Sequence, residues 1–222
     1  MAPKKQNTLK NFIQAIGLFF IALSLFFMPV SVHADSQTSL SLPNFPSFVE
    51  SLKDGSADLL KGVYVPDVLS LPVVQQPIGN PGYVSTNAGV VTQFSMAAEV
   101  GNVGLLAHNH LAGENFVNLN IGDEVRLVYG DGEVEYFVVT ELLEYQALQP
   151  FSPYSEFREL DTEQTISAAE LFRKVYRGDR HVTFQVCIEE NGIDAWGRLF
   201  VIAQPKSATL TEWERIFKKL AF

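Results

Sequence analysis

The chain has 222 residues, of which 47% are apolar and 18% are charged, and its formal net charge is −9. This length suits one domain with a modest core, and so high an apolar fraction excludes a mainly disordered chain. Cys187 is the only cysteine in the sequence, so no intramolecular disulfide can form. Because 16 basic residues face 25 acidic ones and form no basic stripe, we expect no nucleic-acid binding.

Residues 1–34 have the pattern of an export signal. Three lysines among the first ten residues precede an uncharged apolar stretch over residues 15–32, which ends in the small-residue pattern Val32-His33-Ala34. A membrane span needs about 20 residues, so cleavage of a signal peptide and retention as a signal anchor both stay open. In either case we expect the rest of the chain to be exported, with contact to the membrane through this N-terminal segment.

Residues 35–61 mix Ser, Pro and Leu without a sustained period, which predicts a linker or stalk with one short helical piece. From about Gly62 onward, short apolar runs alternate with turn residues, as is typical of the strands of a barrel or sandwich. The sequence Gly130-Asp131-Gly132 separates two such runs and predicts a hairpin. The runs cover residues 63–65, 68–74, 89–94, 103–107, 123–128, 134–140, 182–187 and 199–203. We therefore expect a mainly β domain over residues 62–206.

Two segments have the spacing of a helix start. Ser167-Ala168-Ala169-Glu170 forms a capping-box pattern and predicts a helix over residues 168–177, which Gly178 would end. The same spacing recurs at residues 211–214 and predicts an amphipathic C-terminal helix within residues 207–222.

The unpaired cysteine is a candidate nucleophile. In an exported protein such a residue is either buried and inert or kept for its reactivity, and Cys187 lies where an apolar run meets a polar loop. A nucleophilic thiol needs a proton acceptor and a group that stabilises charge on the acyl intermediates. His108 ends one apolar run and Arg198 opens another, so these residues are candidates for the two roles. Each of the three also fits an ordinary structural position.

Together these residues resemble the sortases, the cysteine transpeptidases of bacterial cell surfaces. The order of His, Cys and Arg, with the Arg eleven residues after the Cys, is similar to that of the family. The segments Leu106-Ala107-His108-Asn109 and Thr183-Phe184-Gln185-Val186-Cys187 look like its histidine and cysteine motifs. Two positions depart from the family pattern: Ala107 replaces a Gly, and Val186 replaces the Thr before the nucleophile.

The resemblance implies a closed, mainly β barrel with a few short helices, and a transpeptidase that needs no cofactor. Cys187 would attack the carbonyl of a C-terminal sorting motif on an exported protein, giving a thioester. An amine acceptor, either a cell-wall precursor or a protein lysine, would then resolve it. His108 and Arg198 would complete the catalytic set. The substrate-binding residues that the resemblance points to are Thr183, Val186, Leu148 and Phe151.

Other interpretations stay open at this stage. A catalytically silent, sortase-like module for surface binding or assembly is compatible with Val186, which removes a hydroxyl group expected near the thiol. A papain-like hydrolase is disfavoured because that family places its Cys before its His. His110 is a second candidate for the catalytic histidine. A zinc site lacks a Cys-x-x-Cys pair, and its ligands would come from His108, His110, His181 and Cys187.

Overall fold

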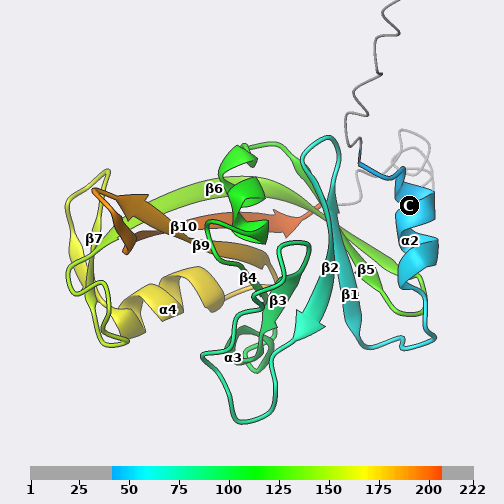
Figure 1. The fold of residues 1–222 in the computed structure, drawn as a ribbon, viewed down its shortest axis with the longest axis horizontal. Helices are drawn as coiled ribbons and strands as arrows, with labels where there is room; N and C mark the ends of the chain where they lie inside the picture. Colours follow the sequence, from blue (N-terminus) through cyan, green and yellow to red (C-terminus); the bar gives the residue numbers. More distant parts are fainter. Residues whose placement is uncertain (1–41, 207–222) are drawn as a thin grey trace, which may run out of the picture. The chain divides into compact units, whose positions relative to one another are not determined.

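A computed structural model describes residues 42–206, and eight of the strands in this range form a barrel. These strands are β1 (Leu60–Val65), β2 (Leu69–Gln75), β3 (Val91–Phe94), β4 (Val103–Leu106), β5 (Glu124–Tyr129), β6 (Val134–Ala147), β9 (Val182–Glu190) and β10 (Ile193–Pro205). Their order is β10-β9-β4-β3-β2-β1-β5-β6, and β6 pairs back onto β10, which closes the barrel (Figure 1). The predicted fold class is therefore confirmed.

The sheet extends beyond β6 through two short strands, β7 (Glu156–Glu159) and β8 (Thr165–Ser167). Neither contains an apolar run, so the sequence pattern did not predict them. Strand β6 is also longer than the predicted run over residues 134–140, because its second half pairs with both β10 and β7. The hairpin between β5 and β6 is confirmed, and Gly132 supplies the positive φ of +92° that its turn requires.

Successive side chains of β9 and β10 alternate between the barrel interior and the outer face. The interior residues belong to the central apolar core, and they are Val182, Phe184 and Val186 on β9 and Leu199, Val201 and Ala203 on β10. The side chains that alternate with these residues, including Cys187 after Val186 and Arg198 before Leu199, therefore lie on the outer face. This alternation decides which residues can meet a ligand.

Helix α4 (Ala168–Tyr176) covers part of that outer face (Figure 1). It packs into a second apolar cluster with residues of β6 and β10, among them Tyr145 and Phe200. Both hydrogen bonds of the predicted capping box are present between Ser167 and Glu170. Gly178, with φ of +113°, follows the last turn. The helix predicted from the sequence is thus confirmed to within one residue.

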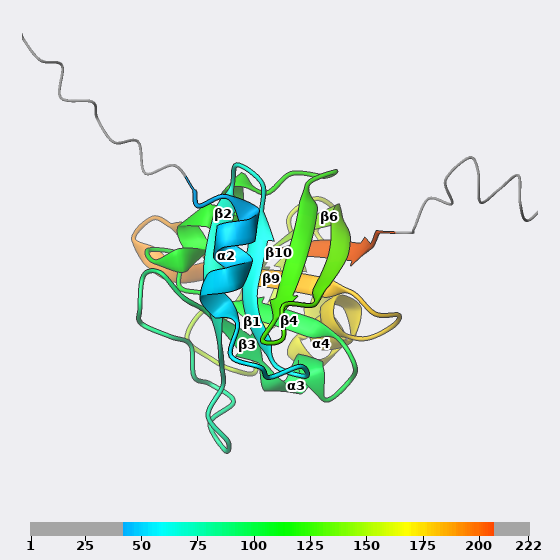
Figure 2. The same ribbon diagram turned by 90° about the vertical axis from the view of Figure 1, so that its right-hand side faces the viewer.

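Helix α2 (Phe45–Leu52) lies against the outside of β1 and β5 (Figure 2). Its Phe48 ring lies 5.7 Å from the ring of Tyr64, centroid to centroid. Gly62 on β1 makes this approach possible, because a Cβ atom there would clash with Phe48 and Leu52. The expected linker over residues 35–61 and domain start at Gly62 therefore need correction: residues 45–61 belong to the folded body.

The remaining described elements are a short helix α3 (Ser95–Ala98) and a 3-10 helix η1 (Ala112–Asn118). The predicted export segment over residues 1–34 and the predicted helix within residues 207–222 lie outside the described residues. Between residues 42 and 206, none of the helices combines the length and the apolar composition that a membrane span requires.

A polar network joins α4 to β6 and β7. The Glu159 carboxylate of β7 accepts hydrogen bonds from Lys174 Nζ of α4 at 2.6 Å and from Tyr145 Oη of β6 at 2.7 Å. The Thr162 hydroxyl donates a further bond to it. These donors, Lys174 first, lower the pKa of Glu159 from 4.5 to about 2. The network fixes α4 over the outer face of the barrel.

We predict that Glu159→Gln lowers the free energy of unfolding at pH 7 by about 1–2 kcal/mol, as expected for loss of a charge-assisted hydrogen bond. Because the pKa of Glu159 is lower in the folded chain, its contribution is complete above the ordinary value of 4.5 and is lost as the pH falls toward 2. Urea unfolding at pH 7 and near pH 2 checks this. Equal destabilisation at both pH values would contradict it.

Candidate active site

Strands β4 and β9 run parallel, and their register places a histidine beside the cysteine. Leu106 at the end of β4 lies opposite Gln185 of β9. The Ala107 amide continues the ladder by donating to the Gln185 carbonyl at 3.3 Å. His108 lies two residues beyond Leu106, past the end of β4, and Cys187 lies two residues beyond Gln185 on β9. The parallel register therefore leads the chain at His108 toward the end of β9 that carries Cys187.

Strand β10 places an arginine on the other side of the same cysteine. Arg198 is the direct partner of Cys187 in the antiparallel pairing of β9 with β10, and directly opposed residues share a face of the sheet. The strand order β4, β9, β10 therefore places Cys187 between Arg198 and the end of β4, which leads into His108. All three side chains are partly exposed. Cys187 thus pairs directly with Arg198, and His108 follows the end of the neighbouring strand β4. Their catalytic roles stay a prediction.

The backbone of His108 is held by the turn that leads into η1. The amides of Leu111 and Gly113 each donate to the His108 carbonyl at 3.0 Å. The His110 ring stacks on the His108 ring, with centroids 5.6 Å apart. Asn109 Nδ2 donates to the Asp194 carbonyl at 3.4 Å, which connects this turn to the hairpin between β9 and β10. These contacts hold the backbone of the turn that carries His108.

The Arg198 guanidinium is only partly engaged. Its Nη1 donates to the carbonyls of Ala195 at 3.0 Å and Gly197 at 2.7 Å. Within residues 42–206 it has no acidic partner. A guanidinium carries five N–H donors, so the Nε and Nη2 donors remain for a ligand. Such a group suits an oxyanion or a peptide carbonyl.

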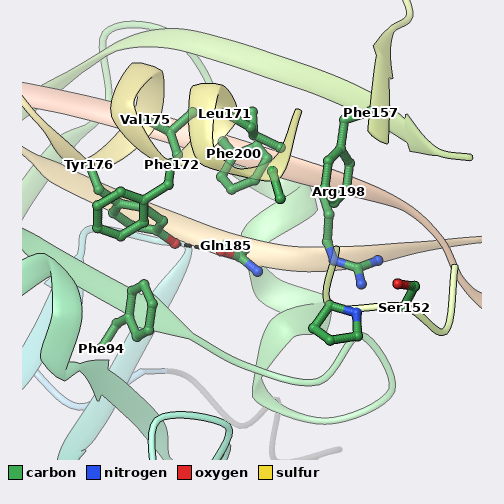
Figure 3. Close-up of a pocket in the computed structure, with 12 residues that line it drawn as sticks. Phe94, Ser152, Phe157, Leu171, Phe172, Val175, Tyr176, Gln185, Arg198 and Phe200 are labelled. Carbon is green, nitrogen blue, oxygen red and sulfur yellow. Dashed lines mark hydrogen bonds between the residues drawn. The ribbon is translucent and has the colours of Figure 1, made fainter. Parts of the chain in front are cut away.

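A cavity of about 270 Å³ runs from Arg198 beneath α4. Figure 3 shows Arg198 near Ser152 at one end and the rings of Phe94, Phe172 and Tyr176 at the other. Arg198 and Gln185, which lies two residues before Cys187 on β9, line this cavity, whereas Cys187 and His108 do not. It is lined mainly by apolar and aromatic side chains.

Gln185 and Tyr176 form a polar contact in the cavity wall, and no local sequence pattern predicted a role for either. The Tyr176 hydroxyl donates to Gln185 Oε1 at 2.5 Å (Figure 3). Burial raises the pKa of Tyr176, so the hydroxyl stays protonated and remains a donor. This bond holds Oε1 of the Gln185 side-chain amide, so the Nε2 group of the same amide remains as a donor toward the cavity.

Two of the predicted substrate-binding residues are buried. Val186 is 2% exposed and packs in the barrel core. Thr183 is fully buried, and its hydroxyl donates to the Val175 carbonyl of α4 at 2.5 Å. Their assignment as substrate contacts is therefore wrong: Val186 points to the opposite face from the thiol, and Thr183 lies beneath α4.

The other two predicted binding residues, Leu148 and Phe151, lie in the loop between β6 and β7 and are exposed. Neither lines the cavity, whereas the neighbouring Ser152 and Pro153 do. A role for Leu148 and Phe151 in substrate binding stays a prediction.

His181 takes no part in the candidate site. Its buried ring lies 2.9 Å from the Val175 carbonyl through Nε2 and 2.7 Å from the Asp179 carbonyl through Nδ1. Among residues 42–206, no three His, Cys, Asp or Glu side chains are grouped so that they could hold a metal ion. The four residues considered for zinc are thus not assembled as ligands.

Comparisons with known proteins give matches only among solved structures: no family model and no curated protein matches the chain. Sortase A of Listeria monocytogenes is 15% identical, with a TM-score of 0.42 over 69% of this chain and 89% of that chain. Sortase C-1 of Actinomyces oris is 15% identical, with a TM-score of 0.44 over 74% and 82%. Sortase A of Corynebacterium diphtheriae is 12% identical, with a TM-score of 0.48 over 78% and 74%. We base the function on this chain's own side chains.

We predict that Gly113→Ala disturbs the turn that holds His108. A Cβ atom at Gly113 would lie 2.6 Å from both the His108 carbonyl oxygen and Val186 Cγ2. Such overpacking should lower the free energy of unfolding by about 1–3 kcal/mol and shift the NMR signals of the His108 ring. The matched control is Gly89→Ala, where the nearest atom is 3.8 Å away. If both variants behave like the parent protein, the close approach at Gly113 is not what positions His108.

Proposed function

We propose that the protein is a sortase-type cysteine transpeptidase. It would cleave a C-terminal sorting motif of exported proteins through a thioester and transfer the acyl group to an amine. The observation that carries the proposal is the direct pairing of Cys187 with Arg198 across β9 and β10, with His108 following the neighbouring strand β4. A nucleophile, a proton carrier and a fixed cation are the groups that acyl transfer requires.

In the first half-reaction the Cys187 thiolate attacks the carbonyl carbon of the scissile peptide. The C–S bond forms and the carbonyl oxygen becomes an oxyanion. As the tetrahedral intermediate collapses, the C–N bond breaks and the leaving amine takes a proton from the His108 imidazolium. The products are a thioester on Cys187, a neutral His108 and a free amine.

In the second half-reaction an incoming amine attacks the thioester carbonyl. Neutral His108 accepts the proton that the attacking nitrogen loses, the C–S bond breaks, and the thiolate is restored together with the imidazolium. A new amide bond joins the acyl group to the acceptor. We propose a cell-wall precursor or a protein lysine as this acceptor.

Arg198 would act on the oxyanion or on the peptide backbone of the acyl segment. A guanidinium does not lose its proton at ordinary pH, so Arg198 cannot serve as the base. Its bonds to the Ala195 and Gly197 carbonyls hold it opposite Cys187 before any substrate arrives. Donors fixed in this way contribute about 10²–10³-fold to the rate in other acyl-transfer enzymes.

The placement of Val186 bears on the alternative of a catalytically silent binding module. That alternative depends on a missing hydroxyl near the thiol, but the Val186 side chain points into the barrel core, away from the outer face. A hydroxyl at this position would not share the face of Cys187. The substitution therefore gives no reason to expect an inert thiol.

We further propose that residues 1–34 direct the domain to the outside of the membrane, where its substrates would be.

The test is formation of an acyl-enzyme on Cys187. The wild-type protein is mixed with a library of peptides, and its intact mass is measured before and after adding hydroxylamine, which releases thioesters. We expect a mass increase that hydroxylamine reverses. Cys187→Ala should show no adduct while its circular dichroism stays unchanged. If Cys187→Ala still joins a peptide to an amine, this result contradicts the proposal.

The two neighbouring histidines provide a matched pair for the same assay. His108 lies two residues beyond Leu106, the last β4 residue paired with β9, whereas His110 lies four residues beyond it. We therefore expect His108→Ala to lose acyl transfer and His110→Ala to retain most of it. The reverse result would move the proton-transfer role to His110.

A further inference from the structure

The basic residues of the described part of the chain fall into two groups. Within residues 42–206, every lysine forms an ion pair, as do Arg126 and Arg180. Four arginines form no ion pair in that range, and they are Arg158, Arg173, Arg177 and Arg198. Glu170 of α4 is the acidic neighbour of Arg173: hydrogen bonds from Ser167 and, to a smaller extent, the charge of Arg173 lower the pKa of this carboxyl.

Two of these arginines lie along a surface depression that continues the cavity at the candidate site. Arg173 and Arg177 are four residues apart on α4 and at its end, so they lie on the same side of the helix. They line a second depression together with Met96, Tyr154 and Phe172. Phe172, Pro153 and Ala168 line both this depression and the cavity that contains Arg198. We call the two together the α4 groove.

The α4 groove combines an apolar floor with a cationic edge. Tyr154 is 88% exposed and Met96 is 41% exposed, so large apolar side chains face solvent there. The guanidinium groups of Arg173 and Arg177 are at the exposed rim. A peptide with apolar and carboxylate side chains would match this surface in both respects.

We propose that the α4 groove binds the acyl-donor segment of the substrate, and that this segment carries Asp or Glu side chains which contact Arg173 and Arg177. The inference rests on the proposed transpeptidase function. It adds the chemical class of the donor, which neither the catalytic residues nor the fold specifies.

The acyl segment is the part of the substrate that needs such a groove. It stays bound to Cys187 through the thioester while the leaving segment departs and the amine enters. One end of the α4 groove is lined by Gln185 and by Arg198, the strand partner of Cys187, and the groove extends from there along α4. A segment held there leaves the remaining side of the thiol open to the acceptor.

The expected effect is moderate because Arg173 and Arg177 are exposed. An exposed ion pair contributes little on its own, so two together should change kcat/KM for an acidic donor by about threefold to tenfold. Screening should reduce the effect at high ionic strength, since the Debye length falls to about 3 Å at 1 M salt.

The experiment uses the full chain and a library of acetylated, amidated decapeptides with all positions randomised. Hydroxylamine serves as the acceptor, because its attack on the thioester converts each acyl segment to a hydroxamate that tandem mass spectrometry can sequence. Wild-type protein is compared with Arg173→Gln/Arg177→Gln. We expect acyl segments enriched in Asp and Glu from the wild type, and loss of that enrichment from the double variant.

Two further variants separate recognition from other effects of removing charge. Arg158→Gln removes another arginine that forms no ion pair in the described range, but this residue lies on β7 and lines neither part of the groove. It should keep the wild-type preference. Arg173→Glu/Arg177→Glu should turn the preference toward Lys and Arg. A merely structural role of the two arginines at the end of α4 would not produce this reversal.

The outcomes distinguish the inference from the proposed function. Hydroxamates without acidic enrichment, or an enrichment that survives in Arg173→Gln/Arg177→Gln, would overturn the inference and leave the transpeptidase function in place. No hydroxamate from the wild type would contradict the proposed function, and the inference would fail with it.

Discussion

Parallel pairing between β4 and β9 determines where the His108 imidazole lies relative to the Cys187 thiol. The two strands are separated by more than seventy residues of sequence, yet the bridge between Leu106 and Gln185 sets their register. A slip of one residue would turn His108 or Cys187 toward the barrel core. The β4–β9 ladder is thus part of the barrel wall and also leads the chain to the candidate active site, so stability and chemistry depend on the same hydrogen bonds.

The inward face of β9 contributes to the barrel core, and its outward face carries the candidate nucleophile. Its inward side chains, such as Phe184 and Val186, fill the barrel core, which leaves the outward positions available for a ligand. Helix α4 covers only part of the outward face, where Thr183 bonds to it, and leaves Cys187 partly exposed. The length and attachment of α4 thus set the boundary between buried sheet and open cavity. The network around Glu159 holds the helix at that boundary.

The sequence predicted the elements whose signals are local. Turn glycines at 130 and 132 predicted the hairpin, and the capping box at Ser167 predicted α4, because both depend on a few adjacent residues. Helix α2 was missed as part of the folded body although Phe45, Phe48, Val49 and Leu52 have helical spacing. Its prolines and serines resemble a linker, and only packing against Tyr64 distinguishes the two.

The candidate site was also predictable only where a local sequence motif identifies the residue. Motif resemblance identified His108, Cys187 and Arg198, and strand register then placed them together. The error at Val186 was avoidable, since a neighbour of an outward-facing Cys187 must face inward. The error at Thr183 was not, because that residue shares the face of Cys187 and is removed from solvent only by α4. The hydrogen bond between Tyr176 and Gln185 depends on tertiary packing, which no local sequence pattern specifies.

Disulfide trapping tests the alignment of His108 with Cys187 most directly. Neighbouring strands lie about 4.8 Å apart, which is within the Cα separation of about 4.4–6.8 Å that a disulfide allows. In the variant His108→Cys, mild oxidation should therefore form an intramolecular bond with Cys187, seen as the loss of two hydrogen masses and of both alkylation sites. Tyr136→Cys is the control, because Tyr136 is exposed and lies nine residues along β6 from Tyr145, the partner of Arg198. Two free thiols in His108→Cys after the same oxidation would contradict the account.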